Sequence, residues 1–235
     1  AADPASRAQA LVSAVLARAP HPRVVEAGCG ARSHLTYPAS ARVTGIDILR
    51  TQLRRNAGSA LAQGDVARLP IATGAADVVV CWDVLEHLPA PDTAIREIAR
   101  VLRPGGLAVL ALPNILSLKG LVTRFTPWRF HVWVYRRVLG DASVGTDAFD
   151  QFPTTLSLVL RPARLRRTAK SIGLRVTDLR LYEGPVPVHL RRRYRAADVA
   201  LSCVSLVTRL VSAGRYDATL SDVILVLAKP DEAIS

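Results

Sequence analysis

Cysteine is scarce in this sequence of 235 residues, which contains only Cys29, Cys81 and Cys203. The three lie far apart, form no Cys-x-x-Cys pair and have no histidine at the spacing of a metal site. Zinc sites and disulfide frameworks are built from cysteines at characteristic spacings. We therefore expect neither, no metal at any site, and a reducing, cytoplasmic setting.

Long apolar runs are missing as well, since no stretch approaches the roughly 20 residues that a membrane-spanning helix needs. Residues 1–20 carry arginines on both sides of a short apolar stretch, which does not fit the continuous hydrophobic segment of a signal peptide. The pattern instead predicts an amphipathic helix over roughly Pro4–Arg18. We expect a soluble protein, and peripheral contact with a membrane stays open.

Internal repeats and low-complexity linkers are absent too. Apolar residues make up 50% of the chain, enough for one substantial core at this length but not for two comfortable domains with linkers. We expect a single domain over residues 1–235.

Acidic residues are in the minority, because 19 Asp and Glu face 31 Lys and Arg, a formal net charge of +12. The excess lies in residues 113–235, which carry 19 basic and 10 acidic side chains. An anionic partner such as RNA or acidic lipid would explain it, and so would a general preference for arginine. Both explanations stay open for two basic clusters: Arg161, Arg164, Arg166, Arg167 and Lys170, and Arg191–Arg193 with Arg195.

What is present from Arg23 to Ala111 is an alternation of short β-rich runs with helical or loop stretches, typical of βαβ units on a parallel sheet. The expected strands are Arg23–Ala27, Arg42–Ile46, Ala60–Gln63, Ala76–Cys81 and Gly106–Leu112. Helices fit between them, most clearly at Asp92–Leu102. Pro104-Gly105-Gly106 then ends this helix and turns the chain into the next strand.

Beyond Leu112 the pattern changes. Residues 113–153 hold most of the aromatic side chains and no convincing strand, and they predict an insertion over the edge of the sheet. Regular elements are then expected at Pro162–Ile172 (helix), Leu174–Tyr182 (strand), Ala196–Ala213 (helix) and Asp222–Ala228 (strand). The long helix has a wide apolar surface, which predicts burial against the sheet. A dimer contact or a docking surface for a lipid acceptor is the alternative.

A Gly-x-Gly turn, Gly28-Cys29-Gly30, follows the first strand and its terminal Glu26. Glycines allow a sharp turn and the close approach of a ligand. A dinucleotide-binding loop would have a third glycine where Ser33 stands, so the turn disfavours NAD or FAD. About twenty residues later Asp47 ends the second strand, the position from which a carboxylate accepts both hydroxyls of a ribose.

Three more segments complete an ordered set: residues 63–70, around Asp65; residues 76–88, which end in Leu85-Glu86-His87-Leu88; and residues 102–106. With the glycine turn and Asp47, they resemble the class I methyltransferases, in particular their methyltransferase type 11 branch, closely over residues 20–112. The resemblance implies an α/β, Rossmann-like fold with a seven-stranded, mostly parallel sheet, the last strand antiparallel, helices on both faces and an aromatic lid after the fifth strand.

On this resemblance the chain divides into an N-terminal helix (1–20), a donor-binding core (21–112), a lid and acceptor insertion (113–160) and the C-terminal part of the sheet (161–235). The implied donor is S-adenosyl-L-methionine, with S-adenosyl-L-homocysteine as product.

The resemblance also implies roles for single residues. Asp47 would hold the ribose hydroxyls, Ile48 would pack on the adenine, and Asp65 with the Val66 N–H would bind its amino group. The other implied donor-binding residues are Glu26, Gly28, Cys29, Gly30, Cys81, Trp82 and His87. His87 is expected on the cofactor side rather than as the base. Arg32 departs from the small residue that is frequent in the family, which leaves the loop after Gly30 open.

The acceptor is expected under the insertion. Cys81-Trp82-Asp83-Val84 stands where relatives that methylate amides or nucleobases carry an Asn/Asp-Pro-Pro-aromatic segment, which argues against that chemistry. A hydroxyl acceptor needs a base, and His131 and then Tyr135 are the candidates, unless their helix only packs over the sheet.

The leading hypothesis is methyl transfer to a small-molecule or lipid-like acceptor, at oxygen. An RNA methyltransferase using the basic second half is one alternative, and a non-catalytic binding or interaction protein is the other.

Overall fold

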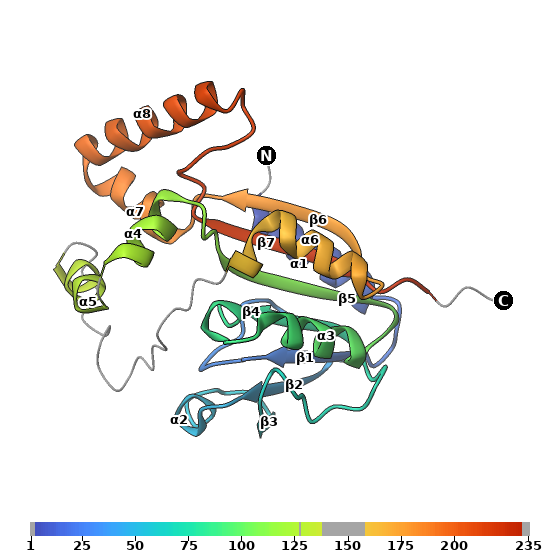
Figure 1. Ribbon diagram of the computed structural model, residues 1–235. Helices are drawn as coiled ribbons and strands as arrows, with labels where there is room; N and C mark the ends of the chain where they lie inside the picture. Colours follow the sequence, from blue (N-terminus) through green and yellow to red (C-terminus); the bar gives the residue numbers. More distant parts are fainter. Residues whose placement is uncertain (1–2, 127, 138–157, 232–235) are drawn as a thin grey trace.

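The structure, a computed structural model, describes residues 3–126, 128–137 and 158–231, and of Trp128, His131, Tyr135 and Leu158 it describes the backbone alone. The described residues form a seven-stranded sheet in the order β3-β2-β1-β4-β5-β7-β6 (Figure 1). Its strands are β1 (Arg23–Ala27), β2 (Arg42–Asp47), β3 (Ala60–Gln63), β4 (Ala76–Trp82), β5 (Leu102–Pro113), β6 (Arg175–Tyr182) and β7 (Asp222–Ala228).

Strand direction matches the expectation. The pairs among β1 to β5 are all parallel, whereas β7 runs antiparallel to both β5 and β6. The predicted mostly parallel sheet with its last strand antiparallel is therefore confirmed.

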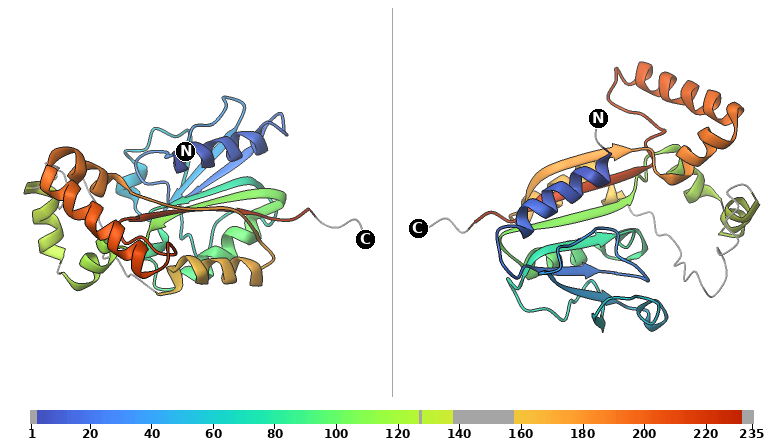
Figure 2. Two further views of the ribbon diagram at one scale, coloured as in Figure 1. Left: turned by 90° about the horizontal axis from the view of Figure 1, so that it is seen from above. Right: turned by 180° about the vertical axis from the view of Figure 1, so that it is seen from behind.

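Helices cover both faces, as predicted. On one face α1 (Pro4–Leu16) buries Val12 and Leu16 against alternate residues of the central strands. On the other, α3 (Pro91–Val101) and α6 (Pro162–Ser171) bury Ile95, Ile98 and Leu165 in the larger core. Figure 2 shows these helices on opposite sides of the sheet. The strands between them are buried on both faces, because β4 and β7 are almost continuously apolar.

The connections between the first four strands differ from the expectation. Helical or loop stretches were expected there, with helices fitting between the strands, but the described residues 28–41 and 64–75 contain no helix, and α2 (Arg50–Leu53) has a single turn. Polar and turn-forming residues fill these segments, so no helical face can form. Pro104-Gly105-Gly106 lies inside β5 as an irregularity, with Gly105 at φ +71°.

Four helices project from the edge of the sheet where the parallel strands end (Figures 1 and 2). They are α4 (Leu118–Phe125), α5 (Trp128–Arg137), α7 (Pro185–Arg193) and α8 (Arg195–Val211). Two short 3-10 helices, η1 (Leu85–His87) and η2 (Leu158–Leu160), complete the described elements. The predicted aromatic lid stays a prediction, because residues 138–157 lie outside the described part.

The expected burial of the long helix is wrong. None of the described residues of α8 is buried, because most of its apolar side chains point into solvent and it is attached to the rest of the protein partly through polar side chains. Ser202 accepts a hydrogen bond from Arg191, and Ser205 donates one to Asp217. An apolar pattern predicts that a helix has an apolar face and does not identify what covers that face.

Candidate functional site

The site candidates meet at the carboxyl ends of β1 and β4, two neighbouring strands from which the chain departs in opposite directions. Such a switch point leaves a crevice where α/β proteins bind ligands. The glycine turn occupies it, with Gly28 at φ +77° and Gly30 at φ +53°. A Cβ at position 28 would lie 2.3 Å from Val84 Cγ2, so only glycine lets the turn pack against the segment after β4.

Glu26 fixes the loop that follows the turn. Its carboxylate is 5% exposed and accepts hydrogen bonds from Ser33 Oγ and Tyr37 OH, both at 2.8 Å. Burial, and then the charge of Glu26, raises the pKa of Tyr37 well above its ordinary value, so this phenol remains a donor. Ser33, whose role the sequence left open, thus links the loop to Glu26.

Asp47 joins the turn to the end of β2. Its Oδ2 accepts from the Gly30 N–H and its Oδ1 from the Leu49 N–H, each at 2.9 Å. A carboxylate has about four lone-pair sites, so each oxygen keeps capacity for one more donor. The side chain of Ile48, the next residue, is 52% exposed and offers an apolar surface at the same edge.

The end of β3 lies beside Asp47, because the Gly64 N–H donates to the Asp47 carbonyl at 3.0 Å. Asp65 Oδ1 accepts from the Ala67 N–H at 2.8 Å, while Val66 is buried. The sheet register therefore brings Asp65 to the same edge as Asp47, as the implied adenosine site requires.

The two predicted cysteines do not present their thiols. Cys81 is fully buried in the core and Cys29 is 5% exposed. Burial, followed by the charges of Asp47 and Glu26, raises the pKa of Cys29 to about 12. Both side chains thus pack as small apolar groups, and a ligand at these positions would contact mainly backbone atoms.

Trp82 forms a ring stack that the sequence did not reveal. His34 lies parallel to it, with ring centroids 4.9 Å apart and planes 3° from parallel. Burial, and then Arg32, lowers the pKa of His34, so the imidazole is uncharged at neutral pH. No spacing signal points to a lone histidine in a loop, which is why His34 was missed.

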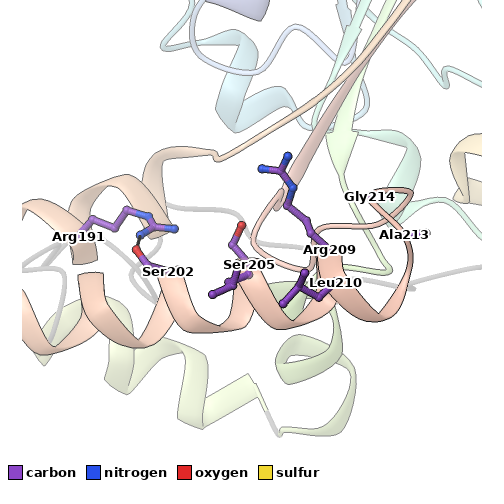
Figure 3. A pocket seen from close by; sticks show the side chains of 8 residues that line it. Arg191, Ser202, Ser205, Arg209, Leu210, Ala213 and Gly214 are labelled. Carbon is purple, nitrogen blue, oxygen red and sulfur yellow. Dashed lines mark hydrogen bonds between the residues drawn. The ribbon is translucent and has the colours of Figure 1, made fainter.

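A cavity of about 420 Å³ opens beside the glycine turn, between the loop after it and β2. Glu26 lines it, together with Arg32, Ser33, Tyr37 and Asn56. The other implied donor residues lie outside its lining. A larger hollow of about 590 Å³ lies between α7 and α8 (Figure 3) and includes none of the predicted site residues.

A group of acidic side chains adjoins the crevice. Asp83 follows β4 at φ +53°, and its N–H donates to the Ala111 carbonyl at 2.9 Å. Glu86 in η1 is 3% exposed, and its Oε2 has no hydrogen-bond partner among the described residues. Asp222 begins β7, and the Nζ of Lys119 lies 3.6 Å from its Oδ1. We call Asp83, Glu86 and Asp222 the acidic group.

Burial and mutual repulsion shift these carboxyls. The atoms packed around the partly exposed Asp83 carboxyl, and then the charge of Asp222, raise its pKa to about 6, and Lys119 opposes this. Burial, and then Asp83, raises the pKa of Glu86 well above its ordinary value. A carboxyl titrating near neutrality in a crevice is suited to accepting a proton. The sequence places Asp83 after β4, but it does not show Lys119 or Asp222 beside it.

His87 ends η1, and its Nε2 lies 3.9 Å from Glu86 Oε1. It is a neighbour of the acidic group, and its predicted donor-side role stays a prediction. His131 and Tyr135 belong to α5, but their side chains lie outside the described part, so their predicted catalytic role stays a prediction too. In the described ranges no helix is long and apolar enough to cross a membrane.

Comparison with known proteins agrees with this geometry. Residues 25–110 match the methyltransferase domain family. Over 169 residues, 67% of its length, the chain is similar to proteins named ubiquinone biosynthesis O-methyltransferase. It is 38% identical to the one from Ralstonia nicotianae and covers 65% of that protein. It is 30% identical to the one from Bordetella pertussis and covers 64% of that protein. A geranyl diphosphate methyltransferase solved with S-adenosylmethionine superimposes with a TM-score of 0.55 at 12% identity, covering 95% of this chain and 85% of that one.

The strand order and the residues at the strand ends thus define a class I, Rossmann-like methyltransferase fold. Residues 25–110 belong to the methyltransferase domain family, as predicted. The chain spans slightly less than two thirds of the curated relatives that it matches.

The residues present fit the donor of this family. A Cβ built on Gly30 meets nothing within 4 Å, so the turn leaves open space. Beside it lie the spare lone pairs of Asp47 and the exposed side chain of Ile48. A carboxylate can accept hydrogen bonds from the ribose hydroxyls of the donor, and an aliphatic side chain can pack on the flat face of its adenine.

Proposed function

We propose that this protein transfers the methyl group of S-adenosylmethionine to a hydroxyl oxygen of a small-molecule or lipid-like acceptor. The observation that carries the proposal is the joining of the glycine turn to Asp47 at the switch point. The O-methyltransferase names of the relatives support oxygen as the methylated atom.

The chain's own residues divide the work of donor binding. Asp47 accepts hydrogen bonds from the ribose hydroxyls, Ile48 packs on the adenine ring, and Asp65 binds the adenine amino group. Glu26 acts by holding the loop that encloses the turn. When bound, the donor supplies an activated methyl group on a sulfonium, so the protein's main task is to align the acceptor oxygen.

Asp83 is the described side chain best placed to remove the acceptor's proton. It follows β4 at the crevice, one residue before Val84, which packs against the glycine turn. Its raised pKa makes it a stronger proton acceptor than an ordinary aspartate while leaving it mostly ionised at pH 7. As pH falls through about 6, Asp83 gains a proton and the basic form is lost.

The test is a methyl-transfer assay with a panel of phenolic, catechol and aliphatic hydroxyl acceptors and of matched amines, with S-adenosylhomocysteine as readout. We expect turnover of a hydroxyl acceptor with kcat falling below pH 6. Asp83→Asn preserves the left-handed backbone, which Asn tolerates, and should lower kcat by about 10²- to 10⁴-fold. Its KM for the donor should stay unchanged.

Glu97→Gln on α3 is the matched control, because it removes one carboxylate far from the crevice and should leave kcat unchanged. Unaltered kcat and pH profile in Asp83→Asn would remove Asp83 from the mechanism. Methylation of amines alone across the panel would contradict oxygen as the acceptor.

A further inference from the structure

Helix α8 is amphipathic, but its orientation is the reverse of that of a helix packed on a core, since its apolar side faces solvent. Its polar side chains face α7 and the loop after α8. Arg191 donates to Asp198 Oδ1 and Ser202 Oγ, both at 2.9 Å, and Ser205 donates to Asp217 Oδ2 at 2.6 Å. In Figure 3 the side chains of Ser205 and Arg209 extend from the same side of α8. The polar side of the helix is thus attached to the protein.

The apolar side of α8 faces outward. Its side chains recur at helical spacing over nearly the whole helix, and all of them are exposed. Leu206, Leu210 and Val211 are 60%, 70% and 85% exposed. We call this surface the α8 stripe; it consists of Ala196, Val199, Ala200, Cys203, Leu206, Val207, Leu210 and Val211. A continuous apolar surface of this kind marks an interaction site, since solvation of aliphatic groups is unfavourable.

The surroundings of the α8 stripe are basic. Arg192, Arg193 and Arg195 are exposed at its N-terminal edge, where α7 ends and α8 begins, whereas Arg209 lies on the polar side of α8 with Ser205. Residues 183–217 contain six arginines and three acidic residues. Two of the acids, Glu183 and Asp198, are paired with Arg191, and Asp217 is bonded to Ser205 and Thr219. Asp217 is also close enough to Arg209 to interact with its charge. No described ion pair joins any of the three acids to Arg192, Arg193 or Arg195.

The neighbouring α4 has the same character. Leu121, Val122 and Phe125 are 45%, 43% and 75% exposed. Residues 113–137, which include α4 and α5, contain five basic side chains and no acidic one. Both α4 and α8 project from the same edge of the sheet (Figure 1), so the combination of exposed apolar and basic groups extends beyond one helix.

We propose that the α8 stripe docks on the surface of an anionic phospholipid membrane. Aliphatic side chains on one face with arginines at its edge are the composition of a helix that lies in the interface, where acyl chains cover the apolar face and phosphates pair with the arginines. A second copy of the chain fits less well, because pairing two stripes would bring their arginines together. Nucleic acid would satisfy the arginines and leave the aliphatic groups uncovered.

This inference goes beyond the proposed function and does not rest on it. If both hold, the helices that contact the bilayer lie at the same edge as the crevice, so a lipid-like acceptor could enter from the membrane.

The test uses Cys203, which lies in the α8 stripe and is the one exposed cysteine of the three. We would attach an environment-sensitive fluorophore to it and add phosphatidylcholine vesicles with or without 30% phosphatidylglycerol, without donor or acceptor. Flotation of unlabelled protein with the same vesicles excludes an effect of the label. We expect a blue shift and flotation with the anionic vesicles, weak binding to neutral ones, and weakening as salt rises.

Substitutions separate the two parts of the surface. Leu206→Gln with Leu210→Gln should lower the partition coefficient at least about tenfold by removing apolar contact. Arg192→Gln with Arg195→Gln should lower it by about tenfold or more on anionic vesicles. The control is Arg166→Gln with Arg167→Gln, which removes two exposed arginines from α6 and should leave binding unchanged. Thermal unfolding checks that every variant is folded.

Absence of binding to anionic vesicles by the folded protein would overturn the proposal. A blue shift without vesicles, together with a dimer in sedimentation equilibrium that Leu206→Gln with Leu210→Gln abolishes, would assign the stripe to a second copy. Binding to RNA that excludes binding to vesicles would also overturn it.

Discussion

At the scale of single residues, the carboxylates of the site differ by their partners. Glu26 and Asp47 are nearly buried, but each accepts two hydrogen bonds from neutral donors, which stabilise the charged form. Glu86 is equally buried, stands beside Asp83 and Asp222, and has one oxygen without a partner in the described structure. Although the three carboxylates are buried to a similar degree, Glu26 and Asp47 hold loops through their hydrogen bonds, whereas the charged form of Glu86 is electrostatically unfavourable.

We predict that Glu86→Gln stabilises the protein at neutral and higher pH. Because the pKa of Glu86 is raised in the folded state, the folded protein binds more protons than the unfolded chain, and stability falls as pH rises toward and through the folded pKa. An amide has no proton to lose. The midpoint of thermal unfolding should rise by a few °C at pH 8 and change little at pH 4.

Glu97→Gln is the opposite control. Arg100, which donates to Glu97 at 2.7 Å, lowers the pKa of Glu97, so its neutralisation should slightly lower stability at pH 8. A loss of stability in Glu86→Gln that is the same at pH 4 and pH 8 would show that shape, and not charge, matters at this position.

Sequence spacing predicted the residues whose roles depend on position in the chain. Glu26 and Asp47 lie in the last residues of β1 and β2, the glycines follow β1, and the structure brings them together. It could not predict Lys119 or Asp222 beside Asp83, because these two neighbours lie in α4 and β7, far from Asp83 in sequence. Their proximity depends on the strand order. His34 over Trp82 depends likewise on the path of an irregular loop.

At the scale of elements, the turn after β1 and the segment after β4 form one unit. Gly28 and Gly30 both have positive φ, but they differ in their surroundings: a Cβ would collide with Val84 at Gly28 and would meet open space at Gly30.

We therefore predict that Gly28→Ala costs more stability than Gly30→Ala. Gly30→Ala introduces backbone strain of about 1–2 kcal/mol, while Gly28→Ala adds a steric clash of about 1–3 kcal/mol. Urea denaturation measures both. Val84→Ala should recover part of the loss caused by Gly28→Ala and none of that caused by Gly30→Ala. Equal costs at the two positions would contradict the packing of Val84 on the turn.

Element prediction succeeded where an apolar pattern had one physical solution. Helices α1, α3 and α6 and the seven strands were predicted to within a few residues, because their apolar positions cover the sheet or lie within it. The helix α8 was predicted too, but not the exposure of its apolar face. Prediction failed for α7, because its two prolines and its arginine run do not form an amphipathic pattern.

At the scale of the whole molecule, the sheet separates two regions. The covered faces contain the two apolar cores, and the carboxyl edge gathers the glycine turn, the acidic group and the four projecting helices (Figure 1). The positive charge of the second half is concentrated in those helices and in the exposed face of α6. The glycine turn with the acidic group and the exposed apolar and basic helices thus lie at one edge of the sheet. The sequence alone indicated the glycine turn much more clearly than the exposed surface of these helices.

The most direct measurement of the central claim is calorimetric titration of the protein with S-adenosylmethionine. We predict one binding site per chain, with binding weakened at least about tenfold by Asp47→Asn, which removes a charge from the ribose contact. Asp178→Asn should leave it unchanged, because Asp178 lies in β6 and pairs with Arg180 of the same strand and with Arg7 of α1. Absence of binding at near-millimolar donor, or equal binding by a folded Asp47→Asn variant, would contradict the claim.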